Sequence, residues 1–258
     1  MTQTTTPSPA APASPPRKSR KWWYIGGAAL LVVLLLGFGI WYFVFRDDSP
    51  EAVDITRAGE TAQESGQGSA RDSSPLDGTW QIDPAVGSFS DFSGTFVGYR
   101  VQEELASIGA KTAVGRTPDV EGSLEIEGTA IPSAEFTANL TTLVSDSDRR
   151  DGALRDQAIQ TSQFPTATFT LTEPIELDKV PADGATIDID AVGTLMLHGV
   201  TKDVTIPLEA QRNGDVIAVT GLVDIAFADY DIEQPTSLAV LSIEDHGILE
   251  VQLFFSKT

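Results

Sequence analysis

The chain has 258 residues and is acidic, with 17 Lys and Arg against 37 Asp and Glu. Residues 1–46 hold five of the basic residues and no acidic one, so the rest has 12 basic and 37 acidic residues, a formal charge of −25. This charge argues against nucleic acid as a partner, because binding to phosphate backbones depends on Lys and Arg. The absence of cysteine excludes disulfides and cysteine-ligated metals, and two histidines leave little material for a metal site.

The N-terminal part is predicted to be a disordered cytoplasmic tail, residues 1–21, followed by a single transmembrane helix. Residues 1–16 are rich in Thr, Ser, Pro and Ala and cannot bury a core. Residues 22–45 form an uncharged apolar run. As a helix this run is about 36 Å long, enough to cross about 30 Å of hydrocarbon. Trp and Tyr residues stand at both of its ends, where they favour the membrane interface.

A cleaved signal peptide is the alternative interpretation of this run. The apolar region of a signal peptide is normally about 7–15 residues long and is followed by small residues. The run here is longer and ends in the bulky residues 42–45, which favours an uncleaved anchor. Four basic residues precede the run, against Arg46 and Arg57 after it. This bias predicts a cytoplasmic N-terminus and an extracytoplasmic C-terminal domain at the cell membrane.

Residues 46–75 are polar and predicted to be a flexible linker, and residues 76–258 form the predicted folded domain. In that domain apolar and polar residues alternate along 122–128, 166–172, 203–210 and 249–255. Alternation of period two is typical of antiparallel strands with one dry face and one wet face.

Turns and helices interrupt the alternation. Asn213-Gly214 predicts a tight hairpin, and Pro207 on a polar-facing position predicts an edge strand or a bulge. Residues 148–163 are predicted to be helical, with Asp148 able to cap the helix. Residues 102–108 are either a shorter helix or a loop. About eight one-sided strands then predict an all-β fold, an antiparallel eight-stranded barrel with one or two short helices.

Three segments resemble the YceI-like family of lipid-binding barrels. Trp80–Asp83 is similar to the opening strand of that family. Arg150-Asp151 with Leu154, followed by Phe164–Phe169, is similar to its helix-to-strand segment, and Gly193–Lys202 (GTLMLHGVTK) closely matches its strand and turn. The resemblance covers roughly residues 79–256, and the His-Gly-Val-Thr part of it is the most specific.

The resemblance implies an extracytoplasmic, lipocalin-like barrel whose lumen takes a polyisoprenoid chain, such as a prenyl quinone or a prenyl phosphate. It implies binding rather than catalysis, with no cofactor beyond the lipid itself. This sequence departs from the family pattern by keeping a membrane anchor. It also departs between Tyr99 and Glu121, near a barrel end, where a difference would affect the ligand that enters.

Inward-facing apolar residues are the candidates to line a lipid tunnel; the alternative is that they pack against one another and fill it. The small residues among them, such as Ala134, Ala138 and Ala167, favour a hollow. Arg150 either meets the polar end of a lipid or ties the predicted helix to a strand. The apolar candidates are Phe136, Leu140, Leu154, Phe164, Phe169, Leu171, Leu195 and Leu197.

No catalytic or metal site is predicted. His198 lies in an expected turn, with no serine or carboxylate at a recognisable motif spacing, and His246 lies in an expected loop. Three functions remain open: a membrane-tethered lipid carrier, a ligand-free interaction module of the cell envelope, and a hydrolase or isomerase built on the barrel. An open lumen favours the carrier, whereas a filled lumen favours the interaction module.

Overall fold

The computed structural model divides the chain into two compact units, residues 1–46 and residues 47–258. In the first unit residues 30–39 and 41 are helical. None of the helices in the described residues is both long and apolar enough to span a bilayer. The rest of the predicted tail and span lies outside the described residues. The residues that the structure describes are 30–39, 41, 49–66, 76–106, 109–236 and 240–258.

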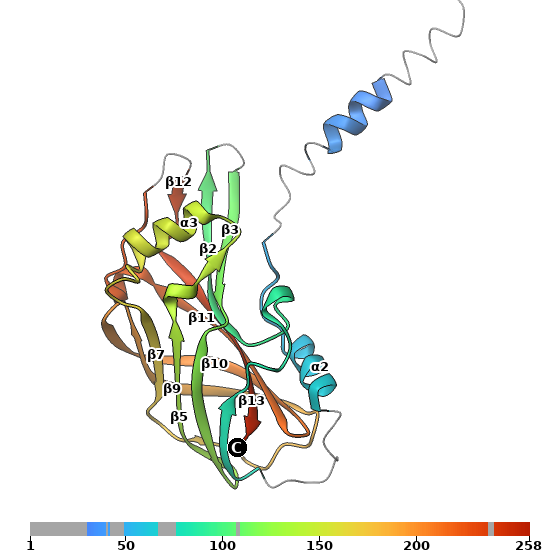
Figure 1. The fold of residues 1–258 in the computed structure, drawn as a ribbon, viewed down its shortest axis with the longest axis vertical. Helices are drawn as coiled ribbons and strands as arrows, with labels where there is room; N and C mark the ends of the chain where they lie inside the picture. The colour runs from blue at the N-terminus through green and yellow to red at the C-terminus, as the bar shows by residue number, and fades with distance from the viewer. Residues whose placement is uncertain (1–29, 40, 42–48, 67–75, 107–108, 237–239) are drawn as a thin grey trace, which may run out of the picture. The chain divides into compact units, whose positions relative to one another are not determined.

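The second unit is the predicted all-β barrel (Figure 1). Eight of its strands close a ring in the order β1-β4-β5-β7-β9-β10-β11-β13, and β13 pairs back onto β1. Every pairing is antiparallel, as the period-two patterns predict. The ring strands are β1 (Gly78–Ile82), β4 (Val120–Glu127), β5 (Ala130–Asn139), β7 (Thr166–Leu171), β9 (Thr186–Leu197), β10 (Val200–Asn213), β11 (Val216–Ala226) and β13 (His246–Lys257).

Further strands pair with the ring strands or with one another. Strand β13 pairs with β1 near its C-terminal end and with β2 farther back, between Ile248 and Gln252. Strand β2 pairs with β3, and shorter strands pair with β2, β3 and β5. These strands are β2 (Phe96–Leu105), β3 (Gly109–Thr117), β6 (Val144–Ser145), β8 (Ile175–Glu176) and β12 (Val240–Ile243).

Neither a helix nor a loop occupies residues 102–105, so the prediction for residues 102–108 is wrong there, whereas Ala106 lies in a turn, as the loop alternative predicts. Residues 102–105 continue strand β2, and Gly109 begins β3; residues 107 and 108 lie outside the described residues. The spacing of three between Leu105 and Ile108 matches a helix, but a segment this short does not distinguish a helix from a strand by its pattern alone. Pairing with β3 over the full length of β2 decides for the strand.

The hairpin at Asn213-Gly214 is confirmed, with a shift of one residue. Asn213 pairs with Val216, so the two loop residues are Gly214 and Asp215, and Gly214 has a φ of 63°. The edge strand or bulge predicted from Pro207 is wrong, because β10 lies between β9 and β11 and pairs with β9 through Pro207 without a shift in register. Pairing of β10 with β11 begins at Leu208, immediately after Pro207. Proline has no N–H to donate, and at this position β11 provides no partner for one.

The predicted helix at 148–163 is shorter than expected. Helix α3 (Asp148–Ala153) continues into the π-helical turn η3 (Leu154–Ala158), and both lie across the end of the barrel near β12 (Figure 1). Ser147, not Asp148, caps the helix by accepting a hydrogen bond from the N–H of Arg150. Short 3-10 turns also occur: η1 (Phe89–Asp91), η2 (Leu140–Thr142) and η4 (Phe227–Tyr230).

The described part of the predicted linker does not form a free tether. Helix α2 (Ile55–Gly66) packs on the outside of β10 and β11, so the described part of this unit has three short helices, α2, α3 and η3, instead of one or two. Asp54 caps α2 through hydrogen bonds from the N–H groups of Thr56 and Arg57. The buried cluster beneath the helix comprises Ile55, Ala58, Ala62, Val86, Val216, Ala218 and Phe254.

The segment before α2 is bound to the barrel through arginine side chains. Arg100 donates to the carbonyl oxygen of Pro50 at 2.9 Å, and Arg116 donates to that of Glu51 at 2.7 Å. Arg116 also pairs with Glu250 at 2.6 Å, and the Glu250 side chain is completely buried. Residues 50–66 therefore cover an ion pair on the outer face of the barrel. Residues 46–48 and 67–75 of the predicted linker lie outside the described residues.

Candidate ligand-binding cavity

The barrel interior is hollow. It contains a main cavity of about 180 Å³ and a second cavity of about 150 Å³ beneath α3 and η3, here called the α3 cavity. The two adjoin, because Val97, Ala167 and Leu249 line both. A single water needs about 10–15 Å³. The side chains of the barrel therefore leave room for a ligand far larger than water.

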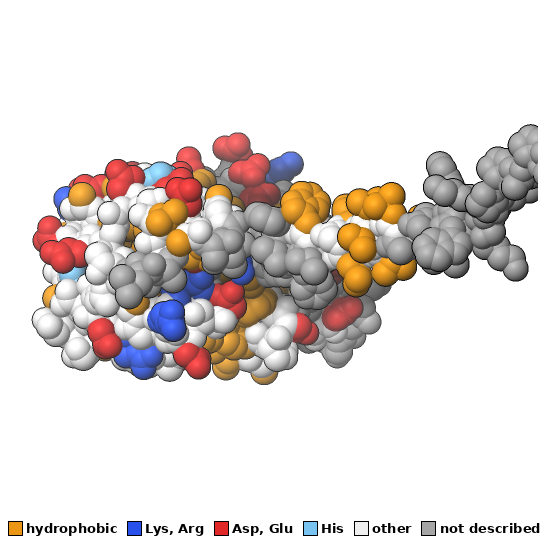
Figure 2. Space-filling view, turned by 90° about the horizontal axis from the view of Figure 1, so that it is seen from above, with side chains coloured by type: hydrophobic (Ala, Val, Ile, Leu, Met, Phe, Trp, Pro, Cys, Tyr) orange, Lys and Arg blue, Asp and Glu red, His pale blue; other side chains and the backbone are white. Residues whose placement is uncertain are grey.

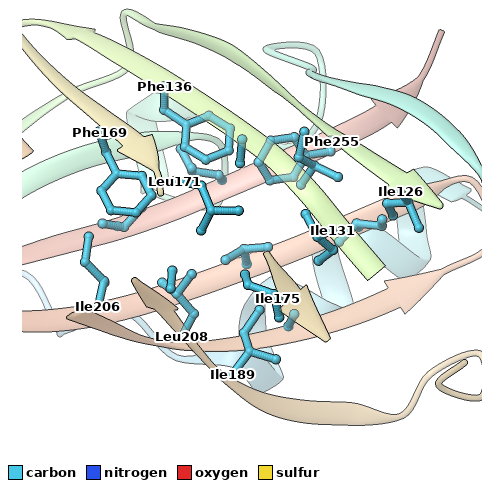
Figure 3. A pocket seen from close by; sticks show the side chains of 18 of the residues that line it. Ile126, Ile131, Phe136, Phe169, Leu171, Ile175, Ile189, Ile206, Leu208 and Phe255 are labelled. Atoms are coloured by element: carbon cyan, nitrogen blue, oxygen red, sulfur yellow. The ribbon is translucent and has the colours of Figure 1, made fainter. Parts of the chain in front are cut away.

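The main cavity is apolar along its length. Phe136, Phe169 and Leu171 converge on it from one side, opposite Ile206 and Leu208 (Figure 3). Its polar lining residues are Thr129, Gln211 and Arg212. This lining follows from strand geometry, since alternate side chains of every ring strand point inward.

Eight of the nine predicted site residues line one of the two cavities. The small residues Ala134, Ala138 and Ala167 also line the main cavity, as expected of residues that leave volume. Phe136, Phe169, Leu171 and Leu195 line the main cavity, and Leu140, Arg150, Leu154 and Leu197 line the α3 cavity.

The structure does not place Phe164 in either cavity lining, which corrects its selection as a lumen residue. Its ring stands edge-on to the His198 ring, with centroids 4.4 Å apart. It also lies against Gly199, whose φ is 75° and whose added Cβ would fall 2.6 Å from a Phe164 ring atom. Phe164 precedes β7, where no strand alternation directs side chains inward, and it packs instead on the β9–β10 turn.

The two histidines lie in different environments. His198 is buried in the β9–β10 turn, as predicted, with a φ of 51° and with Nδ1 2.9 Å from the carbonyl oxygen of Tyr230. His246 is exposed and begins strand β13, so its assignment to a loop is wrong. No group of three or more His, Cys, Asp or Glu side chains is placed to hold a metal ion in the described ranges.

The α3 cavity has a polar end whose residues on β2 were not predicted from the sequence. Tyr99 and Glu103 line it from β2, and Arg150 lines it from α3 and donates to Glu103. Strand alternation places Tyr99, Val101 and Glu103 on one face of β2, but this signal was missed because part of the segment was interpreted as a helix or a loop.

Arg150 ties α3 to the sheet, as one of its two predicted roles requires. One terminal guanidinium nitrogen donates to Glu103 and the other to Asp146. The helix is further held by Asp151, whose Oδ1 accepts hydrogen bonds from the N–H of Ser145 at 3.0 Å and from its hydroxyl at 2.6 Å. These contacts fix the Arg150 side chain at the edge of the α3 cavity.

The protonation states at this end follow from burial and charge. Burial raises the pKa of the Tyr99 phenol, so the hydroxyl stays protonated at neutral pH. Burial opposes the charge on Arg150, but Glu103 outweighs it and raises the pKa of Arg150. Burial likewise opposes the charge on Asp146, and Arg150 outweighs it and lowers the pKa of Asp146. The site therefore contains ionised groups beside a neutral phenol.

Two hydrogen-bond donors at this end lack a partner within the described part of the chain. They are the hydroxyl of Tyr99 and the Nε–H of Arg150, and both atoms are buried. An unsatisfied buried donor costs about 1–3 kcal/mol. Gly115 makes room for the phenol, since an added Cβ there would lie 2.8 Å from the Tyr99 hydroxyl oxygen.

The model of the YceI-like domain family matches residues 79–255. Protein YceI of Escherichia coli O157:H7 is 32% identical over 123 residues, which cover 46% of this chain and 58% of that protein. A UPF0312 protein of Shewanella denitrificans is 31% identical over 117 residues, covering 44% of this chain and 58% of the relative. The chain thus matches little more than half the length of these relatives.

Two solved structures share the fold. A polyisoprenoid binding domain from Saccharophagus degradans, implicated in plant cell wall breakdown, superposes with a TM-score of 0.53 at 20% identity, covering 70% of this chain and 99% of that domain. BcnA from Burkholderia cenocepacia superposes with a TM-score of 0.50 at 16% identity, covering 67% of this chain and 98% of BcnA. At these identities the likeness concerns the barrel fold alone.

Proposed function

Because this chain belongs to the YceI-like family, we propose that its barrel binds and carries a polyisoprenoid or a similar extended apolar lipid, such as a prenyl quinone or a prenyl phosphate. The pair of adjoining apolar cavities along the barrel carries the proposal. Burial of a lipid tail contributes about 0.8 kcal/mol per CH₂ group, which drives binding without polar contacts. The polyisoprenoid-binding domain of Saccharophagus degradans, which shares the fold, supports this class of ligand.

The proposal includes a single-pass anchor at residues 22–45, with the barrel outside the cytoplasm. The apolar run and the basic residues before it support this topology. In the described helical residues 30–36, 38 and 41, the large apolar side chains are 52–64% exposed. A bilayer provides the partner that such a continuous apolar surface requires. Anchoring raises the effective concentration of the barrel near its lipid source.

The surface charge is consistent with a carrier that approaches the membrane only through its anchor. Acidic side chains are spread over the face of the barrel in Figure 2. They repel anionic lipid head groups, so binding of the barrel surface to the bilayer is disfavoured. Lipid exchange then depends on the ends of the hollow rather than on a basic docking face.

Mass spectrometry of organic extracts tests the proposed ligand class. The full chain is purified from membranes in mild detergent, and its extract is compared with that of a membrane protein of unrelated fold purified in parallel. We expect a prenyl lipid enriched with this chain at near-stoichiometric amounts. No enriched lipid, together with no rise in thermal stability when prenyl quinones or prenyl phosphates are added, would reject the carrier function in favour of a ligand-free interaction module.

A further inference from the structure

The hydrogen-bonded wall of the barrel is interrupted where strand β7 ends. We propose that residues 172–185, here called the gate segment, close this gap and that β8 within them separates from β5 to let a lipid enter and leave the main cavity. This route rests on the proposed lipid-carrier function and adds how the lipid reaches the hollow.

The gap arises because β7 is shorter than both of its neighbours in the ring. Strand β7 pairs with β5 over residues 135–139 and with β9 over residues 193–196. Residues 130–134 of β5 and 186–192 of β9 continue beyond it. Among the described strands, only the two-residue strand β8 pairs with β5 there, and none pairs with this side of β9. No continuous ladder of strand pairing therefore joins β5 to β9 beyond the end of β7.

Apolar side chains of the gate segment close this gap and form part of the cavity wall. Ile175 of β8 lies opposite Ile131 of β5 and lines the main cavity with it, and Ile189 lines the same cavity from β9 (Figure 3). Displacing the segment would therefore open the main cavity along an apolar edge, which suits the passage of a lipid tail. The residues of the segment that line the cavity are Ile175, Leu177, Pro181 and Ala185.

The gate segment is held more tightly at its two ends than in its middle. Its first two N–H groups donate to the carbonyl of Val192, and residues 183 and 184 form hydrogen bonds with the β10–β11 hairpin. Between these ends, the N–H of Leu177 donates to the carbonyl of Thr129 at 2.9 Å. Every residue of the segment is exposed or half-buried. Segments with so few buried side chains open locally at a lower free energy than the core of a protein.

The α3 end of the hollow is closed more firmly, which favours the gate segment as the route. Helix α3 precedes β7 and the gate segment follows it, so the two lie at opposite ends of that strand (Figure 1). Arg150 of α3 pairs with Glu103 of β2, whose side chain is 6% exposed. Moving α3 away from β2 would leave this buried carboxylate without its cation. No ion pair among the described residues involves the gate segment.

A reversible crosslink between β5 and β8 tests the gate. Ala130 and Glu176 lie opposite each other, and neither lines a cavity. The adjacent pair, Thr129 and Leu177, shares a hydrogen bond, so the side chains of Ala130 and Glu176 form the closer, non-hydrogen-bonded type of pair. That separation suits a disulfide. The chain has no cysteine, so Ala130→Cys with Glu176→Cys introduces a single disulfide outside the cavity.

Release of a bound probe measures the effect of this crosslink. The full chain in mild detergent is immobilised through an affinity tag, loaded with tritiated geranylgeraniol under reducing conditions, and then oxidised. Thiol titration confirms the crosslink, and the loss of label into buffer with unlabelled geranylgeraniol is timed. We expect oxidation to slow release by about tenfold or more, because the closed gate controls exit, and we expect reduction to restore the original rate.

Thr194→Cys with Asp203→Cys is the matched control. These residues lie opposite each other in β9 and β10, and neither lines a cavity, so their crosslink joins two strands that are already paired along their length. Oxidation should leave its release rate unchanged. Hydrogen exchange of the wild type needs no variant: the amides of residues 175–177 should exchange about tenfold or more faster than those of residues 167–170 in β7.

The outcomes separate the gate from the carrier function. Equal release from the oxidised and reduced gate variant, equal slowing in the control variant, or equal protection of the two sets of amides overturns the gate and leaves the lipid carrier standing. Failure of the wild-type chain to retain geranylgeraniol or any other prenyl lipid overturns both.

Discussion

The guanidinium of Arg150 on helix α3 donates to the carboxylate of Glu103 on strand β2, joining segments 47 residues apart. The Glu103 side chain is 6% exposed and that of Arg150 is 18% exposed. The ion pair lies at the polar end of the α3 cavity, so it both holds the helix over the barrel and shapes the space beneath it.

Loss of this ion pair is expected to destabilise the barrel. Arg150→Met leaves the buried carboxylate of Glu103 without its cation, which should lower the free energy of unfolding by about 3 kcal/mol. Lys202→Met is the control, because Lys202 pairs with Asp229 at 3.9 Å with both side chains well exposed. That change should cost less than about 1 kcal/mol. Urea unfolding measures both values, and equal losses would contradict the structural role of Arg150.

A bulky residue at the junction of the two cavities is expected to block lipid binding. Ala167 lines both cavities, so Ala167→Phe places a ring between them. Overpacking costs about 1–3 kcal/mol, which a stable barrel tolerates. The lipid recovered by mass spectrometry should fall at least severalfold relative to the wild type. Ala110→Phe, at an exposed position of β3, should retain the lipid; an unchanged yield from both variants would count against the hollow as the lipid site.

Helix α2 is expected to be part of the folded barrel domain. Ala62 is completely buried between the helix and the sheet, so Ala62→Glu forces a charge into an apolar contact and should lower stability by about 2–4 kcal/mol. Gln63→Glu introduces the same residue at the neighbouring exposed position and should have little effect. Thermal unfolding combined with hydrogen exchange over residues 55–66 tests this. Rapid exchange of these amides in the wild type would instead favour the predicted flexible linker.

Alkaline pH should reveal the buried phenol of Tyr99. Burial raises its pKa in the folded state above the usual value of about 10. Above pH 10 the unfolded chain loses the phenol proton while the folded chain keeps it, so stability falls as the pH rises from about 10 toward the folded-state pKa. Tyr99→Phe should reduce this fall. The check is the unfolding midpoint of both proteins at pH 9 and pH 11, and parallel curves would argue against a buried Tyr99 hydroxyl.

The sequence by itself determined the barrel and the inward faces of its strands. The alternation that places Phe169 and Leu171 on one face of β7 is local, because successive side chains in a strand point to opposite sides whatever the strand pairs with. Alternation gives no guide for Phe164, which lies outside a strand. It was not applied to residues 102–105, where a short helical spacing predicted a helix or a loop instead of the strand that is found.

Only the tertiary structure decided how distant segments meet. In the sequence, the small residues of α2 are typical of a linker. In the structure they are buried against Val216 and Phe254, which lie far along the chain. Likewise, Tyr99 and Arg150 lie 51 positions apart in the chain, and the fold alone brings them to one cavity. Local patterns determine which way a side chain points, whereas its neighbours depend on strand pairing and helix packing over the whole domain.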